Sequence, residues 1–216
     1  MSIWTSKGGA AALLCCAVLS GCVVPPGGGA NSGAQPGRQA VLGGAVTLAA
    51  PPGYCIEPAS RLEREDTAIL LMGRCDGAAD RAPAVLTGTV GAAGSGAGVD
   101  IAGGGPELAA FFRSERGRAA LSRRGRARDV VLHEALGING AFLLRLTDTG
   151  PGKGTPVQAQ SWRAVLPLGG RLVSLTVAGT AAAPLDRAAG RKLIEAFVVA
   201  TRAANRGTTA KSTATP

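Results

Sequence analysis

The sequence is poor in the side chains on which much enzyme and nucleic-acid chemistry depends. It has one histidine, His133, and its aromatic residues are two Trp, one Tyr and four Phe in 216 residues. A single histidine excludes a metal centre built from several of them, and so few aromatic rings leave little surface for stacking on bases. The apolar run Ala10–Leu19 is too short to cross a bilayer, which takes roughly 20 apolar residues.

No motif predicts a catalytic, cofactor-binding or metal-binding residue. His133 and Glu134 are neighbours in an expected strand, where successive side chains point to opposite faces, so they do not act together on one substrate. Ser95 stands in Gly-Ser-Gly without the G-x-S-x-G elbow of hydrolases. The glycine-rich segments 94–98 and 152–155 lack the spacing of dinucleotide and phosphate loops. We therefore expect a non-enzymatic protein without a cofactor; a hydrolase with an unrecognised site is an alternative.

The N-terminal segment has the order of a secretory signal. A head with one positive charge, Lys7, is followed by the apolar run and then by small residues before a cysteine. The last four residues of this segment, Leu19-Ser20-Gly21-Cys22, resemble the lipobox of bacterial lipoproteins. The resemblance implies that the chain is cut before Cys22, which receives a diacylglycerol thioether and an acyl group on its new amino terminus. An ordinary signal peptide that contains a cysteine is the alternative.

Residues 1–21 are thus the predicted signal peptide and residues 22–40 a lipidated tether, whose Gly, Pro, Ser, Asn and Gln content is typical of a flexible chain. The partner of this segment is membrane lipid, because several acyl chains on Cys22 form a firm anchor. We expect the protein in the bacterial cell envelope, facing the periplasm. Val23, rather than an aspartate, follows the cysteine. In bacterial lipoproteins, a residue other than aspartate at this position favours sorting to the outer membrane over the inner membrane, so the resemblance implies the outer membrane.

The remaining cysteines predict one disulfide. Cys15 and Cys16 are removed with the predicted signal peptide, and Cys22 is the predicted lipidation site. Cys55 and Cys75 therefore remain as one pair. Two leftover cysteines in an oxidising compartment are expected to be bridged. A metal or redox pair is the alternative, but neither cysteine has a C-x-x-C spacing or a histidine and carboxylate cluster beside it.

The mature chain is basic. Loss of Lys7 lowers the Lys and Arg count from 23 to 22 against 14 acidic residues, which gives a formal charge of +8. In the envelope such a charge favours lipid phosphates, lipopolysaccharide and acidic wall polymers, and not nucleic acid. Arg113, Arg116, Arg123 and Arg124 fall on one face of an expected helix. They are a candidate docking face for an envelope protein or an anionic surface; a solvated helix face is the alternative.

Periodicity in the rest of the chain indicates both strands and helices. Asn139-Gly140 and 167–170 are turn signals that predict two antiparallel hairpins. Pro106 and Pro184 open two helices, each with an apolar face. The expected strands are 45–49, 54–56, 67–74, 85–90, 130–135, 141–147, 158–166 and 171–178.

These elements predict an α+β fold with an antiparallel β-sheet covered by two main helices, an α/β/α sandwich-like arrangement. They form one domain, 41–205, followed by a disordered tail, 206–216. Their order resembles that of PsbP-like domains, which are α/β/α sandwiches that work as accessory or binding subunits. The resemblance implies no site residue. We expect a binding or accessory module; a carrier that holds a small apolar ligand between helix and sheet is the alternative.

Overall fold

The computed structural model describes residues 37–101, 103–152 and 154–206. The predicted signal peptide, the lipobox with Cys22, the tether up to residue 36 and the tail from residue 207 lie outside the described residues. Within the described ranges, no helix is long and apolar enough to span a membrane.

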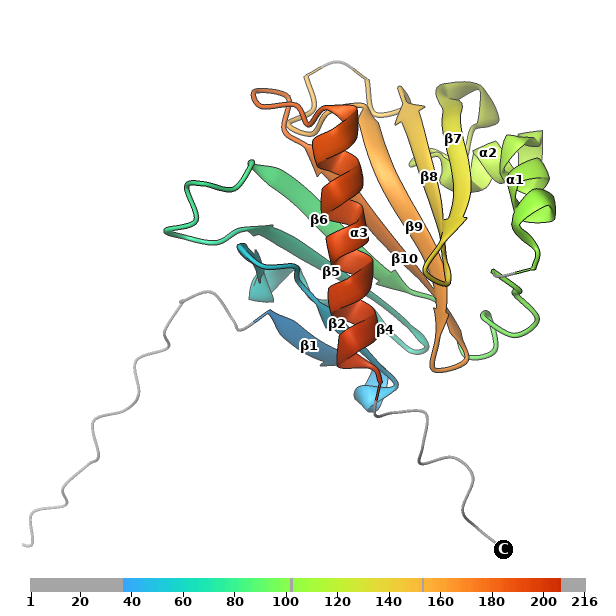
Figure 1. The fold of residues 1–216 in the computed structure, drawn as a ribbon, viewed down its shortest axis with the longest axis horizontal. Coiled ribbons are helices and arrows are strands. Elements are labelled where there is room, and N and C mark those ends of the chain that lie inside the picture. The colour runs from blue at the N-terminus through green and yellow to red at the C-terminus, as the bar shows by residue number, and fades with distance from the viewer. Residues whose placement is uncertain (1–36, 102, 153, 207–216) are drawn as a thin grey trace, which may run out of the picture. The chain divides into compact units, whose positions relative to one another are not determined.

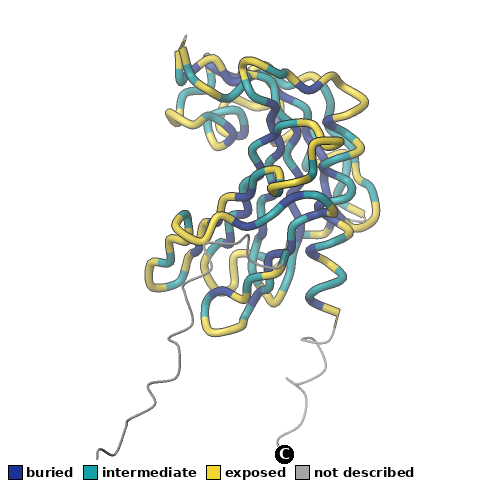
Figure 2. Tube along the Cα trace, turned by 90° about the vertical axis from the view of Figure 1, so that its left-hand side faces the viewer, coloured by how far each residue is buried: buried dark blue, intermediate teal, exposed yellow. Residues whose placement is uncertain are grey.

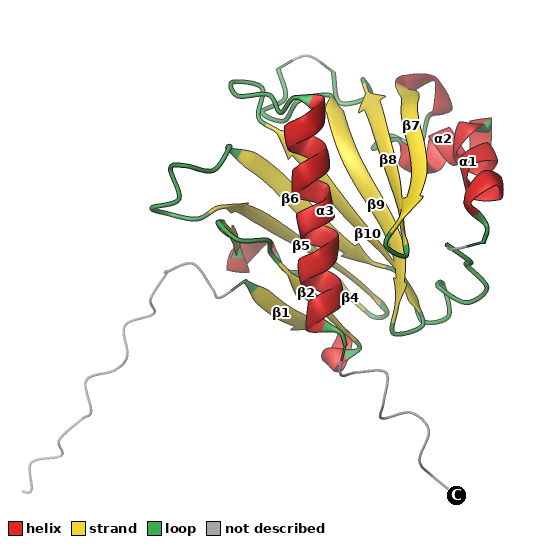
Figure 3. Cartoon of the chain, in the orientation of Figure 1, coloured by secondary structure: helices red, strands yellow, loops and turns green. Residues whose placement is uncertain are grey.

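An antiparallel sheet of eight strands organises the described residues (Figure 3). Seven of its strands follow the order β3-β5-β6-β10-β9-β8-β7, and the short β4 pairs with β5. The strands are β3 (Tyr54–Ile56), β4 (Leu62–Arg64), β5 (Thr67–Arg74), β6 (Ala84–Val90), β7 (Val130–Ile138), β8 (Ala141–Asp148), β9 (Gln160–Leu168) and β10 (Arg171–Gly179).

A separate two-stranded ribbon precedes the sheet. Its strands are β1 (Arg38–Val41) and β2 (Val46–Ala49), joined by a 3₁₀ turn, η1 (Leu42–Gly44). Strand β1 begins inside the segment predicted as tether, so that boundary is wrong by three residues. The ribbon is stabilised by a contact between β2 and the C-terminal helix. The two segments are distant in sequence, so the local sequence does not indicate this contact. Two further 3₁₀ turns are η2 (Pro58–Ser60) and η3 (Ala127–Asp129).

Two hairpins have the turns that the sequence predicts. Asn139 and Gly140 have φ values of 51° and 69° between β7 and β8, and Gly169 and Gly170 have 56° and 72° between β9 and β10. Positive φ at both central residues is the geometry of a type I′ turn, whose twist matches that of the flanking strands. The predicted antiparallel pairing of both hairpins is confirmed.

Helices cover both faces of the sheet, so the predicted α+β class is confirmed. The helix α3 (Arg187–Ala204) packs on β9 and β10 and buries Ile194 and Phe197 completely. On the opposite face, α1 (Gly105–Arg113) and α2 (Glu115–Leu121) pack against β7. Alternation along β8 supplies both cores: Leu143 belongs to the cluster under α3, and Leu144 belongs to the cluster under α1 and α2. Figure 1 shows α3 crossing the sheet, with α1 and α2 at its β7 end.

The first helix is broken where the sequence predicts continuity. Ser114 is extended, with ψ of 165°, and its Oγ accepts a hydrogen bond of 3.1 Å from the backbone N–H of Gly117, which caps α2. A Cβ on Gly117 would collide with the carbonyl oxygen of Phe111, so the end of α1 can approach α2 only because residue 117 is glycine. The single long helix expected after Pro106 is therefore wrong, and the helical part ends at Leu121.

Part of the second face of the sheet is left exposed. The strand registers place Leu62, Ile69 and Leu71 on the same face as the cluster under α1 and α2. Their side chains are 47%, 38% and 39% exposed, and Thr87 and Thr89 beside them are half-buried. We call these five residues the open face. Figure 2 shows how exposed and buried residues are distributed along the chain.

Candidate functional site

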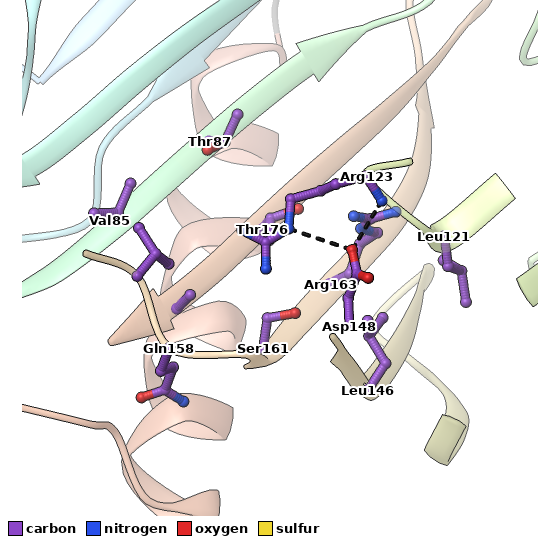
Figure 4. Close-up of a pocket in the computed structure, with 12 residues that line it drawn as sticks. Val85, Thr87, Leu121, Arg123, Leu146, Asp148, Gln158, Ser161, Arg163 and Thr176 are labelled. Carbon is purple, nitrogen blue, oxygen red and sulfur yellow. Dashed lines mark hydrogen bonds and ion pairs between the residues drawn. The ribbon is translucent and has the colours of Figure 1, made fainter. Parts of the chain in front are cut away.

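A small pocket lies where the open face meets the end of α2 (Figure 4). Its volume is about 130 Å³, and residues of β6, β8, β9 and β10 form its floor. Leu121 and Arg123 approach it from the end of α2 and the turn that follows. The pocket thus brings together segments of the chain that lie up to about ninety residues apart in sequence, from Val85 to Ala178.

Strand register places an arginine at the centre of this floor. Arg163 on β9 pairs with Thr176 of β10 on one side and with Leu144 of β8 on the other, and Thr176 pairs with Thr87 of β6. Directly paired residues on neighbouring strands point to the same face, so these side chains form one row across the sheet. Ser161, two residues before Arg163, also lines the pocket because strand side chains alternate.

The Arg163 guanidinium has an unusual environment. Its Nε is buried and has no hydrogen-bond partner among the described residues. Burial lowers the pKa of Arg163, while the nearby Asp148 carboxylate raises it and Arg123 lowers it further. Because arginine keeps its charge at any physiological pH, this half-buried side chain holds a partly desolvated positive charge without an ion pair among the described residues.

Asp148 does not supply that counter-ion, because other donors already occupy it. Its carboxylate is 3% exposed and accepts hydrogen bonds from the backbone N–H of Arg123 (2.8 Å), the backbone N–H of Gly150 (2.9 Å) and Nε of Arg123 (3.3 Å). Burial alone would raise the pKa of Asp148, but these donors lower it below its ordinary value. Asp148 is therefore ionised, and its hydrogen bonds hold the segment after α2 against β8.

A second buried acid stands beside the first. Asp129, 9% exposed, accepts a hydrogen bond of 2.7 Å from Nε of Arg126. Both carboxylates lie close to the Cα of Gly150, where an added Cβ would come within 2.8 Å of Asp129 and 3.0 Å of Asp148. The two acids are each paired with an arginine, and the Arg123–Asp148 pair lines the pocket.

The four arginines of the predicted docking face do not share one helix. Arg113 ends α1, Arg116 lies in α2, and Arg123 and Arg124 follow the end of α2. The helical projection that grouped them is wrong because the backbone breaks at Ser114. All four are exposed, and Arg123 is also paired with Asp148.

His133 and Glu134 occupy separate settings. Nε2 of His133 lies 2.9 Å from Oγ1 of Thr147 at the surface. Glu134 accepts hydrogen bonds from Nε of Arg187 (2.7 Å) and Nε of Arg145 (2.5 Å), and these lower its pKa to about 2, against a smaller opposing effect of burial. A carboxylate so strongly ionised is a poor proton acceptor, and it joins the start of α3 to β7 and β8.

Cys55 and Cys75 form a disulfide with 5.0 Å between their Cα atoms, which is the predicted pairing. It joins β3 to the end of β5. Cys22, the predicted lipidation site, lies outside the described residues. In the described ranges, no group of three or more His, Cys, Asp or Glu side chains could hold a metal ion.

Arg163 is not among the site residues that the sequence predicts. The sequence contains part of the information, because the charged Arg163 interrupts an apolar strand. Its neighbours Trp162 and Ala164 have side chains buried under α3. A charge on the opposite face of a central strand needs either solvent or a partner. Its neighbours, however, come from strand register and from the turn after α2, which the sequence pattern does not provide.

Comparisons of the sequence with known protein families and with curated proteins give no match. Among solved structures, the Saccharomyces cerevisiae Ran-binding protein Mog1p is similar, with a TM-score of 0.44 and 12% identity over 79% of this chain and 94% of that one. A mutant of the protein Mog1 has a TM-score of 0.45 and 12% identity over 77% of this chain and 93% of that one.

Proposed function

We propose that the protein is a lipid-anchored component of the bacterial envelope whose folded domain binds a protein partner. One observation carries the proposal: the sequence Leu19-Ser20-Gly21-Cys22 ends a basic and apolar head of the length of a secretory signal. Acylation of Cys22 holds the mature chain at the membrane, and residues 23–36 connect this anchor to the first strand.

The disulfide supports an exported protein. Disulfides persist in oxidising compartments and are rare where thiols are kept reduced. The Cys55–Cys75 bridge lies in the folded domain. Its presence in the fold agrees with a domain that faces the periplasm.

The open face supports binding to another protein. Leu62, Ile69 and Leu71 form an exposed apolar centre, the hydroxyls of Thr87 and Thr89 lie next to it, and the Arg163 pocket adjoins it. Apolar side chains beside polar and arginine-containing surface are typical of protein interfaces. The formal charge of +8 on the mature chain favours a partner with an acidic surface.

The alternative of an apolar-ligand carrier is less well supported. A ligand between helix and sheet needs space under α3, and that layer is filled by Ile194, Phe197 and Val198, each at most 2% exposed. Trp162 fills the position opposite Gly190. The packing therefore disfavours a ligand beneath the middle of α3.

Crosslinking in intact cells tests the proposal. A photoreactive amino acid at Leu71 should give a discrete protein adduct in the membrane fraction, whereas the same residue at Val131, 56% exposed on the edge strand β7, should not. The same cells carrying Cys22→Ser should lose the membrane-associated adduct. Equal crosslinking from both positions, or none from Leu71, would contradict partner binding at the open face.

A further inference from the structure

We infer that the Arg163 pocket binds a small oxyanion, a carboxylate or a phosphate group, which pairs with the Arg163 guanidinium. The inference concerns the folded domain and stands whether or not Cys22 is acylated. It goes beyond partner binding because it assigns a chemical class of ligand to a defined pocket.

The charge distribution of the pocket leaves one positive charge uncompensated. The charged residues that line it are Arg123, Asp148 and Arg163, and Arg123 is paired with Asp148. The buried Nε of Arg163 has no partner within the described ranges, and no carboxylate there lies within 4.0 Å of its guanidinium nitrogens. A partly desolvated charge without a partner is unfavourable, and an anion bound in the pocket lowers that cost.

The hydrogen-bond donors around Asp148 explain why its carboxylate does not repel such an anion. Three hydrogen bonds, two from backbone N–H groups and one from Arg123, point at the Asp148 carboxylate. Arg123 balances the negative charge of this carboxylate. The acid therefore fixes the position of Arg123 at the pocket while the positive charge of Arg163 remains available.

Uncharged groups of the pocket suit the oxygens of an anion. Ser161, Thr176 and Thr87 line it with hydroxyls, each of which can donate a hydrogen bond. Leu121 and Leu146 supply apolar walls, which strengthen an ion pair by lowering the local dielectric. The guanidinium itself presents donors in a fork that matches carboxylate and phosphate geometry.

Size limits what the pocket accepts. Its volume of about 130 Å³ equals that of roughly four water molecules in the liquid. This space admits a carboxylate or a phosphate group but not a whole nucleotide. The group can be free or can belong to a lipid headgroup, in which case the acyl chains would extend over Leu71, the neighbour of Thr87 on β5.

Titration of the full-length protein in a mild non-ionic detergent tests the site. The probes are sodium phosphate, sodium acetate and dihexanoyl phosphatidic acid, each compared with sodium chloride at equal ionic strength. Calorimetry measures affinity, and the arginine Nε–H region of a ¹H–¹⁵N spectrum reports contact at Arg163. We expect saturable binding of at least one probe together with a shift of the Arg163 signal.

Two variants separate the site from general charge attraction. Arg163→Gln should weaken binding at least tenfold, because it removes a charge-assisted hydrogen bond. Arg124→Gln removes the same charge from an exposed residue outside the pocket and should leave binding unchanged. Circular dichroism checks that both variants are folded.

The three probes distinguish the sources of the anion. Saturation by phosphate or acetate alone identifies a free anion, and tighter binding of the short-chain lipid identifies a headgroup. Absence of saturable binding by every probe, or equal weakening in Arg163→Gln and Arg124→Gln, would overturn the inference.

Discussion

Replacement of Arg163 by methionine should stabilise the protein. The guanidinium lies on a central strand with a buried Nε that has no partner among the described residues. Methionine keeps a long unbranched side chain in the same space and carries no charge. Asp148 keeps its three donors after the change, so the variant leaves no new unpaired acid.

The size of the effect follows from the cost of keeping a charge out of water. Replacing buried ionic groups by apolar residues of similar volume is often neutral or stabilising by about 1 to 4 kcal/mol. Arg163 retains part of its interaction with Asp148, so we expect a gain near the low end, about 1 kcal/mol. For a domain of this size that gain raises Tm by roughly 2 to 4 °C.

Thermal unfolding in a buffer without phosphate or carboxylate measures this gain. The matched control is Arg145→Met on the neighbouring strand β8, because Arg145 has a partner, Glu134, at 2.5 Å. Arg145→Met should lower Tm. A fall in Tm for Arg163→Met comparable to that of Arg145→Met would refute the reasoning, since Arg163 would then have a stabilising partner in the fold.

Three further predictions concern the rest of the domain. The pKa of Glu134 is lowered to about 2 in the fold, against about 4.3 in the unfolded chain. The ionised carboxylate therefore stabilises the fold above about pH 4.3, and this stabilisation is lost as the pH falls toward 2. Wild type should lose more stability than Glu134→Gln between pH 7 and pH 3. Gly190→Ala should lower the free energy of unfolding by about 1 to 2 kcal/mol, because its Cβ would lie 2.7 Å from Trp162. Removal of the Cys55–Cys75 disulfide, which spans 20 residues, should cost about 3 kcal/mol and lower Tm by roughly 6 to 12 °C.

Each of these has a result that would count against it. Equal acid sensitivity of wild type and Glu134→Gln in urea titrations would show that the carboxylate adds no pH-dependent stability. Gly105→Ala is the control for Gly190→Ala, because no atom lies within 4 Å of its added Cβ, and the idea of a steric clash fails if the two variants have equal Tm. An unchanged Tm in reductant would mean that the bridge does not constrain the unfolded chain.

Features with a strong local signal were predictable from the sequence. The hairpin turns Asn139-Gly140 and Gly169-Gly170 require positive φ, which few residues other than these adopt easily. The apolar stripe of α3 recurs at helical spacing, and its members Ile194, Phe197, Val198 and Thr201 are buried. The pairing of Cys55 with Cys75 followed from counting the cysteines left after Cys22.

Features that depend on distant contacts were not predictable. Ser114 and Gly117 break a helix whose apolar spacing looks continuous, because the close approach of α1 and α2 is a tertiary contact. The short strands β1 and β4 lie at edges and have too few residues to show alternation. The surroundings of Arg163 come from the register of four strands and from the turn after α2.

The central claim is that Cys22 is a lipid anchor, and the mass of the mature N-terminus tests it most directly. The protein is isolated from membranes of its own bacterial host, digested, and its N-terminal peptide is measured by mass spectrometry. If Cys22 is lipidated, the peptide begins at Cys22 and carries a diacylglycerol and an amide-linked acyl group. An unmodified peptide, or one that begins at any other residue, would contradict it.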